Sequence, residues 1–230
     1  MFASILYRGN NVECPICKKQ FSKFLPYGSN RAYRENVLCP NCLSLERHRL
    51  LWIYLNQKTS LFTAPNRFLH MAPEQCFHKR FKKLKNIEYI TGDLESPLAE
   101  HHFDLHDIPF ESNSFDVVMC NHVLEHVNDA DKCISELHRV LKPGGWAIMQ
   151  VPIDYSRNET YEDPAIVSPE DREEHFWQKD HLRLFGKDYP DKLRKAGFSV
   201  REDDFVNTIG QDLRERFKLQ KEEVIYYATK

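Results

Sequence analysis

Two pairs of closely spaced cysteines are the residues of this chain best suited to bind a metal ion. Each pair has two residues between its cysteines, one of them a proline that favours a tight turn, and 21 residues separate the pairs. Four thiolates presented by two such turns form a tetrahedral donor set for Zn²⁺. The spacing between the pairs is slightly longer than is usual for zinc ribbons, and a longer loop absorbs the difference. We therefore predict a zinc site whose ligands are Cys14, Cys17, Cys39 and Cys42.

A site closed by four thiolates leaves no open position on the metal, so this zinc is expected to be structural rather than catalytic. Without metal, such a small module would bury too little apolar surface to fold alone. The alternatives are four incidental buried cysteines, iron–sulfur ligation, which uses other spacings, and a ligand role for His48 in place of a packing role. The other three cysteines are scattered singly, which favours a reduced, cytoplasmic setting over a disulfide framework.

The composition is that of a folded chain with one substantial core and a small additional module. The 230 residues are 41% hydrophobic and 12% aromatic, which excludes an intrinsically disordered chain. No apolar run approaches the length of a membrane span, and the N-terminus lacks a secretory signal pattern. Residues 1–60 hold nine Lys and Arg against three Asp and Glu, whereas residues 111–230 hold 17 against 24. The basic N-terminal segment indicates either an anionic partner or the solvated surface of a small metal module.

Apolar strands and amphipathic helices alternate from Arg67 to the end of the chain. The predicted strands are 67–71, 87–91, a short strand ending near 104, 115–120, 146–151, 198–205 and 224–228, and the predicted helices are 75–84, 129–141, 188–196 and 211–220. This alternation predicts an α/β fold with a doubly wound, mostly parallel sheet. The expected domains are a zinc-binding module at 1–60, closed by a helix that Ser44 caps, and an α/β domain at 61–230.

Aspartates stand where successive strands of this sheet are predicted to end. In an open parallel sheet, ligands bind beyond the carboxyl ends of the strands, here beside the turn from Ala72 to Glu74. Asp93 lies 21 residues after Ala72 at the next strand end, where a carboxylate accepts hydrogen bonds from both hydroxyls of a ribose. Asp104, near the third strand end, is placed to reach an adenine amino group. Either aspartate alone also suits a solvated loop, but their order predicts a nucleoside site.

The central part of the chain resembles class I S-adenosylmethionine-dependent methyltransferases, most closely the type 11 subgroup. The motifs that carry the resemblance are 104–110 (DLHDIPF), 114–118 (SFDVV), 121–127 (NHVLEHV) and 136–145 (ELHRVLKPGG). The resemblance covers about residues 65–228 and implies a Rossmann-like sheet of seven strands, the last of them antiparallel and beside the fifth. The cysteine-rich N-terminus is similar to zinc-ribbon extensions of some bacterial members, including ribosomal-RNA guanine methyltransferases.

The first loop departs from the family pattern of an acidic residue followed by three spaced glycines. His70, Ala72, Glu74 and Cys76 stand in place of the acid and the glycines. One hypothesis is that Glu74 forms a charge-assisted hydrogen bond with the α-ammonium group of the cofactor, worth about 1.5–3 kcal/mol. The alternative is that Glu74 only begins the next helix favourably against its dipole. The residues expected to bind S-adenosylmethionine are Ala72, Glu74, Asp93, Asp104, Leu105 and Asn121.

The methyl acceptor is expected beyond the ends of the fourth and fifth strands. His122 is the first candidate for a general base if the acceptor is a hydroxyl or a ring nitrogen, because imidazole suits proton transfer near neutral pH. The alternative is that His122 only lines the pocket. Glu125 and His126 are expected to cap or orient the next helix.

An acidic insertion with several aromatic residues follows the fifth strand. This segment, 153–181, is expected to cover the acceptor as a lid. His181 and Arg183 at its end are predicted to be mainly structural, with a role in the pocket as the alternative.

The motifs favour an S-adenosylmethionine-dependent methyltransferase that acts on a small-molecule acceptor. One alternative is an RNA base methyltransferase in which the basic zinc ribbon binds the phosphate backbone, and steep salt dependence would distinguish it. The other alternative is a non-catalytic protein that keeps the fold as a zinc-dependent interaction module, which the altered first loop supports. Binding of S-adenosylmethionine would argue against this last alternative.

Overall fold

The computed structural model describes residues 5–28 and 33–230, and the chain forms two compact units. The first unit comprises Met1–Ala64, Glu74–Asn86 and Asp203–Ile225, and the second comprises Pro65–Pro73, Ile87–Glu202 and Tyr226–Lys230. Each unit is therefore assembled from segments that are distant in the sequence. Within the described ranges, no helix combines the length and the apolar character needed to cross a membrane.

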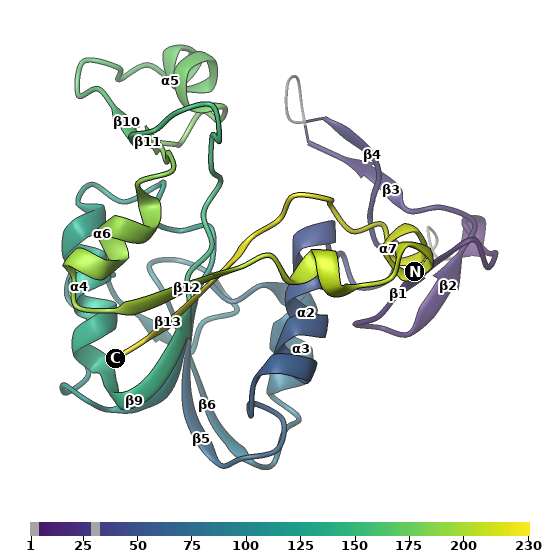
Figure 1. Cartoon of the computed structure of the whole chain (residues 1–230), viewed down its shortest axis with the longest axis horizontal. Helices are drawn as coiled ribbons and strands as arrows, with labels where there is room; N and C mark the ends of the chain where they lie inside the picture. The colour runs from purple at the N-terminus through teal and green to yellow at the C-terminus, as the bar shows by residue number, and fades with distance from the viewer. Residues whose placement is uncertain (1–4, 29–32) are drawn as a thin grey trace. The chain divides into compact units, whose positions relative to one another are not determined.

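The second unit is built on a seven-stranded sheet with the strand order β12-β13-β9-β8-β5-β6-β7 (Figure 1). The strands are β5 (Asn66–Met71), β6 (Ile87–Asp93), β7 (His101–His102), β8 (Phe115–Cys120), β9 (Leu141–Ile148), β12 (Ser199–Asp203) and β13 (Ile225–Thr229). β5 pairs in parallel with β6 and β8, and β9 is parallel to β8. β13 is antiparallel to β9. The predicted doubly wound sheet is confirmed, including a last strand that lies antiparallel beside the fifth.

β8 is apolar at every position except Asp116, as expected of a strand covered on both faces, whereas polar residues of β5 stand mainly at its start. Phe68 and Leu69 of β5 are fully buried, as are Val118 and Cys120 of β8. The registers pair Leu69 with Val118 and Met71 with Cys120, so β5 and β8 end level with each other. Residues that follow these parallel strands consequently meet at one edge of the sheet.

Helices α4 (Ala130–Val140), α5 (Pro169–Phe176) and α6 (Tyr189–Lys195) complete the second unit. α4 begins after Asp129, whose side chain accepts a hydrogen bond from the backbone N–H of Lys132 at 2.9 Å. α4 and α6 lie side by side (Figure 1), with Lys192 Nζ 3.6 Å from Asp131 Oδ1. The predicted insertion 153–181 carries α5 and the short strand β10 (Tyr161–Glu162), which pairs with β11 (Arg183–Leu184).

The first unit contains two small antiparallel hairpins and several helices. Its elements are β1 (Val12–Cys14), β2 (Lys19–Phe21), β3 (Leu25–Tyr27), β4 (Arg34–Leu38), α2 (Glu46–Lys58), α3 (Gln75–Phe81), the 3₁₀ helix η2 (Phe205–Thr208) and α7 (Gln211–Phe217). β1 pairs with β2, and β3 pairs with β4. The turn between β1 and β2 carries the first cysteine pair, and the second pair begins directly after β4.

A buried arginine of α2 ties three segments of the first unit together. Arg49 Nη1 donates hydrogen bonds to the carbonyls of Val37 and Ser44, at 2.8 and 2.9 Å. Its Nε donates to the carbonyl of Phe217 at 2.6 Å, and its Nη2 donates to that of Lys218 at 3.1 Å. One guanidinium therefore satisfies backbone acceptors around the cysteine turns and at the end of α7.

The predicted cap of α2 is wrong by one residue. The N-cap residue is Leu45, whose backbone N–H donates to Nδ1 of His48 at 3.1 Å. The Ser44 hydroxyl lies 3.2 Å from the sulfur of Cys14 and 3.3 Å from that of Cys42. Ser44 does not cap the helix because its hydroxyl contacts the cysteine cluster.

The predicted stop of α4 is correct, but the strand after it begins earlier than expected. α4 ends at Val140 and β9 begins at Leu141, so the sequence Lys-Pro-Gly-Gly forms the start of a strand rather than a loop. A Cβ atom on Gly145 would lie 2.9 Å from the carbonyl oxygen of Asp116. The close approach of β8 to β9 therefore accounts for glycine at this position.

Candidate functional site

The four predicted zinc ligands come together in the first unit. Their sulfur atoms all lie within 4.8 Å of one another, with Cys14 and Cys42 3.5 Å apart and Cys17 and Cys39 3.7 Å apart. Thiolates 2.3 Å from a tetrahedral zinc ion lie about 3.8 Å from one another. All four are free thiols, so no disulfide accounts for the close approach. Hydrogen bonds from the other three thiols, that of Cys17 foremost, lower the pKa of Cys14. The donor set and its dimensions fit zinc.

The turn after β5 lies at the carboxyl edge of the sheet in the second unit. Ala72 has a φ of 47°, the left-handed region that glycine adopts more readily, and its N–H donates to the carbonyl of Gly92 at 2.8 Å. The loop therefore keeps a glycine-like backbone turn although alanine stands in place of the family glycine.

Asp93 ends β6 at the same edge. Its Oδ1 accepts hydrogen bonds from the backbone N–H groups of Glu95 at 2.9 Å and Ser96 at 2.7 Å. The other carboxylate oxygen accepts none from the described residues. A side chain on the preceding Gly92 would overlap Phe103, since a Cβ atom there would lie 2.4 Å from the ring. The carboxylate is thus fixed by its own turn and keeps one oxygen for a ligand.

Asp104 is held by a short chain of hydrogen bonds beyond β7. Its Oδ1 accepts from the backbone N–H of His106 at 2.9 Å and lies 2.5 Å from the Nδ1 of that residue. His106 Nε2 accepts from the backbone N–H of Asp129 at 3.1 Å, so the ring proton is on Nδ1. These hydrogen bonds, the backbone one foremost, lower the pKa of Asp104. Leu105 beside it is buried, so an ionised carboxylate and an apolar side chain follow β7 together.

Glu74 belongs to the first unit, unlike the other residues predicted to bind the cofactor. It is the N-cap residue of α3, without a capping hydrogen bond from its side chain, and its Oε1 lies 4.0 Å from Nε2 of His48. A bond from Glu74 to an ammonium group stays a prediction.

The loop after β8 begins with two residues of the predicted site. Asn121 is buried, and its Oδ1 accepts from the backbone N–H of Gln150 at 3.3 Å. His122 has a φ of 55°, which is uncommon for a residue other than glycine, and its N–H donates to the carbonyl of Gln150 at 2.7 Å. Gln150, the second residue after β9, therefore contacts both residues and holds His122 in a strained conformation.

Glu125 lies against His122 rather than capping a helix, which corrects the sequence-based expectation. Its Oε1 is 3.3 Å from Nδ1 of His122 and 4.0 Å from Nε2 of His126. The helix that follows is capped by Asp129 instead. Burial opposes ionisation of Glu125, but the hydrogen bond and charge of His122 outweigh burial and lower the pKa of Glu125. A buried carboxylate thus orients the candidate base.

His181, at the end of the insertion, completes this cluster from 56 residues further along the chain. Its Nδ1 lies 2.8 Å from the carbonyl of Phe176, and its ring packs edge-to-face on His126 at 4.8 Å. Burial lowers the pKa of His181. Three buried atoms in the cluster have no hydrogen-bond partner, namely His122 Nε2, Glu125 Oε2 and His181 Nε2. Buried polar atoms are nearly always paired, so these three atoms need partners that a bound molecule or water would supply.

Arg183 joins the insertion to the loop that carries His122. Its buried side chain donates to the carbonyls of Leu124, Val127 and Asn128, and its Nε donates to Glu162 of β10 at 2.7 Å. The Arg183 guanidinium therefore donates hydrogen bonds to three carbonyls of one loop and to a carboxylate of the insertion.

We expect Arg183→Lys to lower the free energy of unfolding by about 3 kcal/mol, because one ammonium group cannot replace four donors to buried acceptors. Urea unfolding monitored by near-UV circular dichroism measures the change. The control is Arg157→Lys, which alters the ion pair of an exposed arginine with Asp154 and should cost less than about 1 kcal/mol. Equal losses in the two variants would contradict the assigned role of Arg183.

Comparison with known proteins shows that residues 66–149 are similar to methyltransferases. Residues 66–149 match the family model of a methyltransferase domain, Methyltransf_11. Over 80 residues the chain is 31% identical to the ubiquinone/menaquinone biosynthesis C-methyltransferase UbiE of Idiomarina loihiensis, which covers 34% of this chain and 28% of that protein. Over 65 residues it is 45% identical to a demethylmenaquinone methyltransferase of Staphylococcus epidermidis, which covers 28% of this chain and 22% of that protein. The similarity thus spans less than a third of each relative.

Solved structures agree on the fold. The chain superposes on the [4+2]-cyclase SpnF with a TM-score of 0.56 and 16% identity, covering 90% of this chain and 87% of that one. It superposes on an S-adenosylmethionine-dependent methyltransferase of Mesorhizobium loti with a TM-score of 0.50 and 14% identity, covering 79% and 98%. Residues 66–149 are therefore similar to a methyltransferase domain, and the strand order and the superpositions show the corresponding fold.

Proposed function

We propose that the second unit transfers a methyl group from S-adenosylmethionine to a small polar molecule. The observation that carries the proposal is the group of buried, unpartnered polar atoms of His122, Glu125 and His181, on the loop after β8 and at the end of the insertion. The similarity to quinone-biosynthesis methyltransferases supports a small acceptor. A polar group of the acceptor would supply the missing hydrogen-bond partners.

Residues at the carboxyl edge of the sheet would hold the cofactor, which supplies a methyl group activated on a sulfonium. The free oxygen of Asp93 suits the ribose hydroxyls, and Asp104 with Leu105 suits an adenine ring and its amino group. Ala72 lets the backbone turn closely after β5, as a glycine would. Asn121, fixed by Gln150, lines the approach to the acceptor.

His122 is the proposed general base. Glu125 fixes the imidazole through Nδ1, which leaves Nε2 to accept a proton from a hydroxyl or ring nitrogen of the acceptor. Glu125, His126 and His181 also have ligand atoms within 4.8 Å of one another. Nitrogen and oxygen ligands 2.1 Å from a tetrahedral metal lie about 3.4 Å apart, so the 4.0 Å between Glu125 and His126 suits an enclosed polar group better than a metal ion.

We also propose that the cysteine cluster of the first unit holds a structural Zn²⁺. The support is the match between the sulfur spacings and a tetrahedral thiolate site.

Asp93→Asn is expected to weaken binding of S-adenosylhomocysteine by about 10- to 100-fold, measured by isothermal titration calorimetry. Asparagine keeps the Oδ1 that holds the turn, but it replaces the free carboxylate oxygen with an amide nitrogen and removes the charge. The control is Asp107→Asn, a change of equal charge in an exposed loop. An unchanged affinity for Asp93→Asn would contradict the ribose contact, and no binding by the wild-type chain would favour a non-catalytic protein.

The acceptor class is tested with tritiated S-adenosylmethionine. The chain is incubated with a small-molecule extract and, separately, with total RNA, and label is counted after separation by size. We expect label in the small-molecule fraction. Label confined to RNA would contradict the proposed acceptor.

A further inference from the structure

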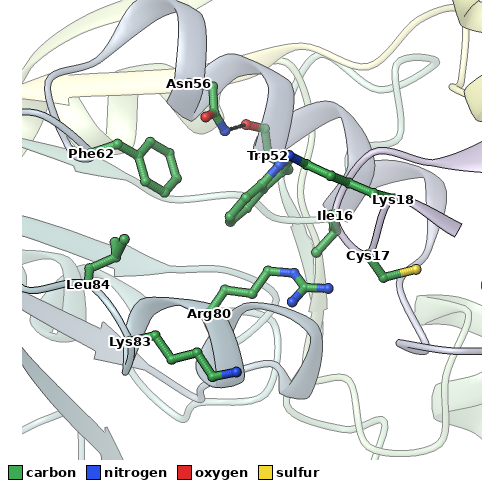
Figure 2. Close-up of a pocket in the computed structure, with 9 residues that line it drawn as sticks. All are labelled: Ile16, Cys17, Lys18, Trp52, Asn56, Phe62, Arg80, Lys83 and Leu84. Atoms are coloured by element: carbon green, nitrogen blue, oxygen red, sulfur yellow. Dashed lines mark hydrogen bonds between the residues drawn. The ribbon is translucent and has the colours of Figure 1, made fainter.

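The first unit contains an open pocket of about 430 Å³ that adjoins the first cysteine turn and includes no residue of the proposed methyl-transfer site. This volume falls within the range of about 300–1,000 Å³ that is usual for small-molecule sites. The lining residues come from the first cysteine turn, from α2 and the segment after it, and from the end of α3. They are Ile16, Cys17, Lys18, Trp52, Asn56, Phe62, Arg80, Lys83 and Leu84 (Figure 2).

The apolar part of this cavity has a fixed aromatic wall. The Trp52 ring packs edge-to-face on Phe62 at 5.1 Å and is stacked on Phe77 at 6.3 Å and Phe81 at 6.1 Å. In Figure 2, Phe62 and Leu84 lie at one side of the cavity with Trp52 between them and the cysteine turn. The orientation of the Trp52 ring is therefore fixed before a ligand binds, and its face suits a flat apolar group.

The polar part of the cavity is cationic. Lys18, Arg80 and Lys83 line it, no acidic residue does, and none of the three forms an ion pair among residues 5–28 and 33–230. Nε of Arg80 is buried and has no hydrogen-bond partner. In Figure 2 the Arg80 and Lys83 side chains extend from α3 and the turn after it, away from Leu84. Unbalanced cations and an unpaired guanidinium nitrogen indicate an anionic ligand.

We propose that this cavity binds a nucleoside phosphate, with the base against Trp52 and the phosphate against Arg80, Lys18 and Lys83. Aromatic stacking combined with basic groups is the chemistry that recognises an unpaired nucleotide. The source is either a free mononucleotide or a nucleotide of single-stranded RNA. The inference goes beyond methyl transfer, since all of the residues that carry it belong to the first unit.

The cysteine turn shapes one wall of this nucleotide site. Lys18 follows Cys17 directly, has a φ of 56°, and donates its backbone N–H to the carbonyl of Cys14 at 2.7 Å. The zinc-binding turn thus places one of the three cations.

The test is calorimetric titration of the full chain with UMP, AMP, inorganic phosphate and a 12-nucleotide single-stranded RNA. The double variant Arg80→Gln/Lys83→Gln is expected to bind UMP or AMP at least tenfold more weakly than the wild type. The matched control Lys79→Gln/Lys85→Gln removes the same charge from exposed residues of the same segment that do not line the cavity. It should bind as the wild type does.

Binding of S-adenosylhomocysteine should be equal in both double variants, which separates this inference from the proposed methyl transfer and shows that both fold. RNA binding without mononucleotide binding, lost on changing Arg80 and Lys83, would assign the site to RNA. The proposal is overturned if the wild type binds neither nucleotides nor RNA, if both double variants lose equal affinity, or if inorganic phosphate binds as tightly as UMP.

Discussion

Replacing Cys39 with serine is expected to abolish zinc binding and to unfold the first unit. The hairpins that carry the cysteines are short, so their fold depends on the proposed metal. Structural zinc contributes on the order of 10 kcal/mol in small zinc modules, and a serine oxygen is a poor substitute for a thiolate. Zinc content, measured by plasma mass spectrometry, should fall from one ion per chain to below about 0.1. Far-UV circular dichroism should show the accompanying loss of structure.

The matched control is Cys76→Ser, which changes a buried cysteine of the same unit outside the cluster. This variant should keep one zinc ion per chain, although a buried hydroxyl will lower its stability. If the Cys39 variant retains its metal and its spectrum, the four sulfurs do not form a structural site. Equal loss of zinc from both variants would mean that misfolding, and not the missing ligand, releases the metal.

His122→Asn is expected to reduce the rate of methyl transfer by about 10²- to 10⁴-fold, which is the usual contribution of a general base. Asparagine keeps a polar side chain of similar reach but cannot accept the proton. The rate is measured with the acceptor isolated by the tritium experiment. The affinity for S-adenosylhomocysteine should not change, because the imidazole acts on the acceptor and not on the cofactor.

Glu125→Gln tests how this base is positioned. Glutamine keeps the size of the side chain and a hydrogen bond to His122, but it removes the negative charge. We expect a lower kcat with little change in KM, because orientation of the base matters more in the transition state than in the substrate complex. His175→Asn, a histidine of α5 outside the cluster, is the control and should leave both constants unchanged. If the His122→Asn variant keeps the wild-type rate of methyl transfer, His122 is not the general base.

The sheet could be predicted well because its strands and their ends carry local patterns. β8 matches its predicted range of 115–120, since a mostly apolar run is typical of a strand covered on both faces. β9 could not be placed as well, because its second to fifth residues are Lys-Pro-Gly-Gly, which ordinarily mark a loop. The tight packing that requires Gly145 is a tertiary feature. The short strand expected to end near 104 is β7, which is only two residues long and ends at His102.

Residues of the methyl-transfer site could be predicted only where each directly follows one strand in the sequence. Asp93 could be found from its distance to the first turn, and Asp104 and His122 from motifs of the family. Glu125 contacts His122 within one loop, where the sequence suggested a role at the next helix instead. The approach of His181 to Glu125 and His126 depends on a return of the chain after the insertion. No local pattern marks such a return. The cavity beside Trp52 was missed for the same reason, since three separate segments line it.

The hydrogen bonds of Arg49 constrain when the first unit can fold during translation. Two of its acceptors, the carbonyls of Phe217 and Lys218, are translated 168 and 169 residues after it. Until those residues leave the exit tunnel, a buried guanidinium lacks half of its partners. The segment around Arg49 is therefore expected to stay incompletely folded until residue 218 has emerged. A nascent chain stalled before residue 217 should be much more sensitive to protease around Arg49 than the released protein.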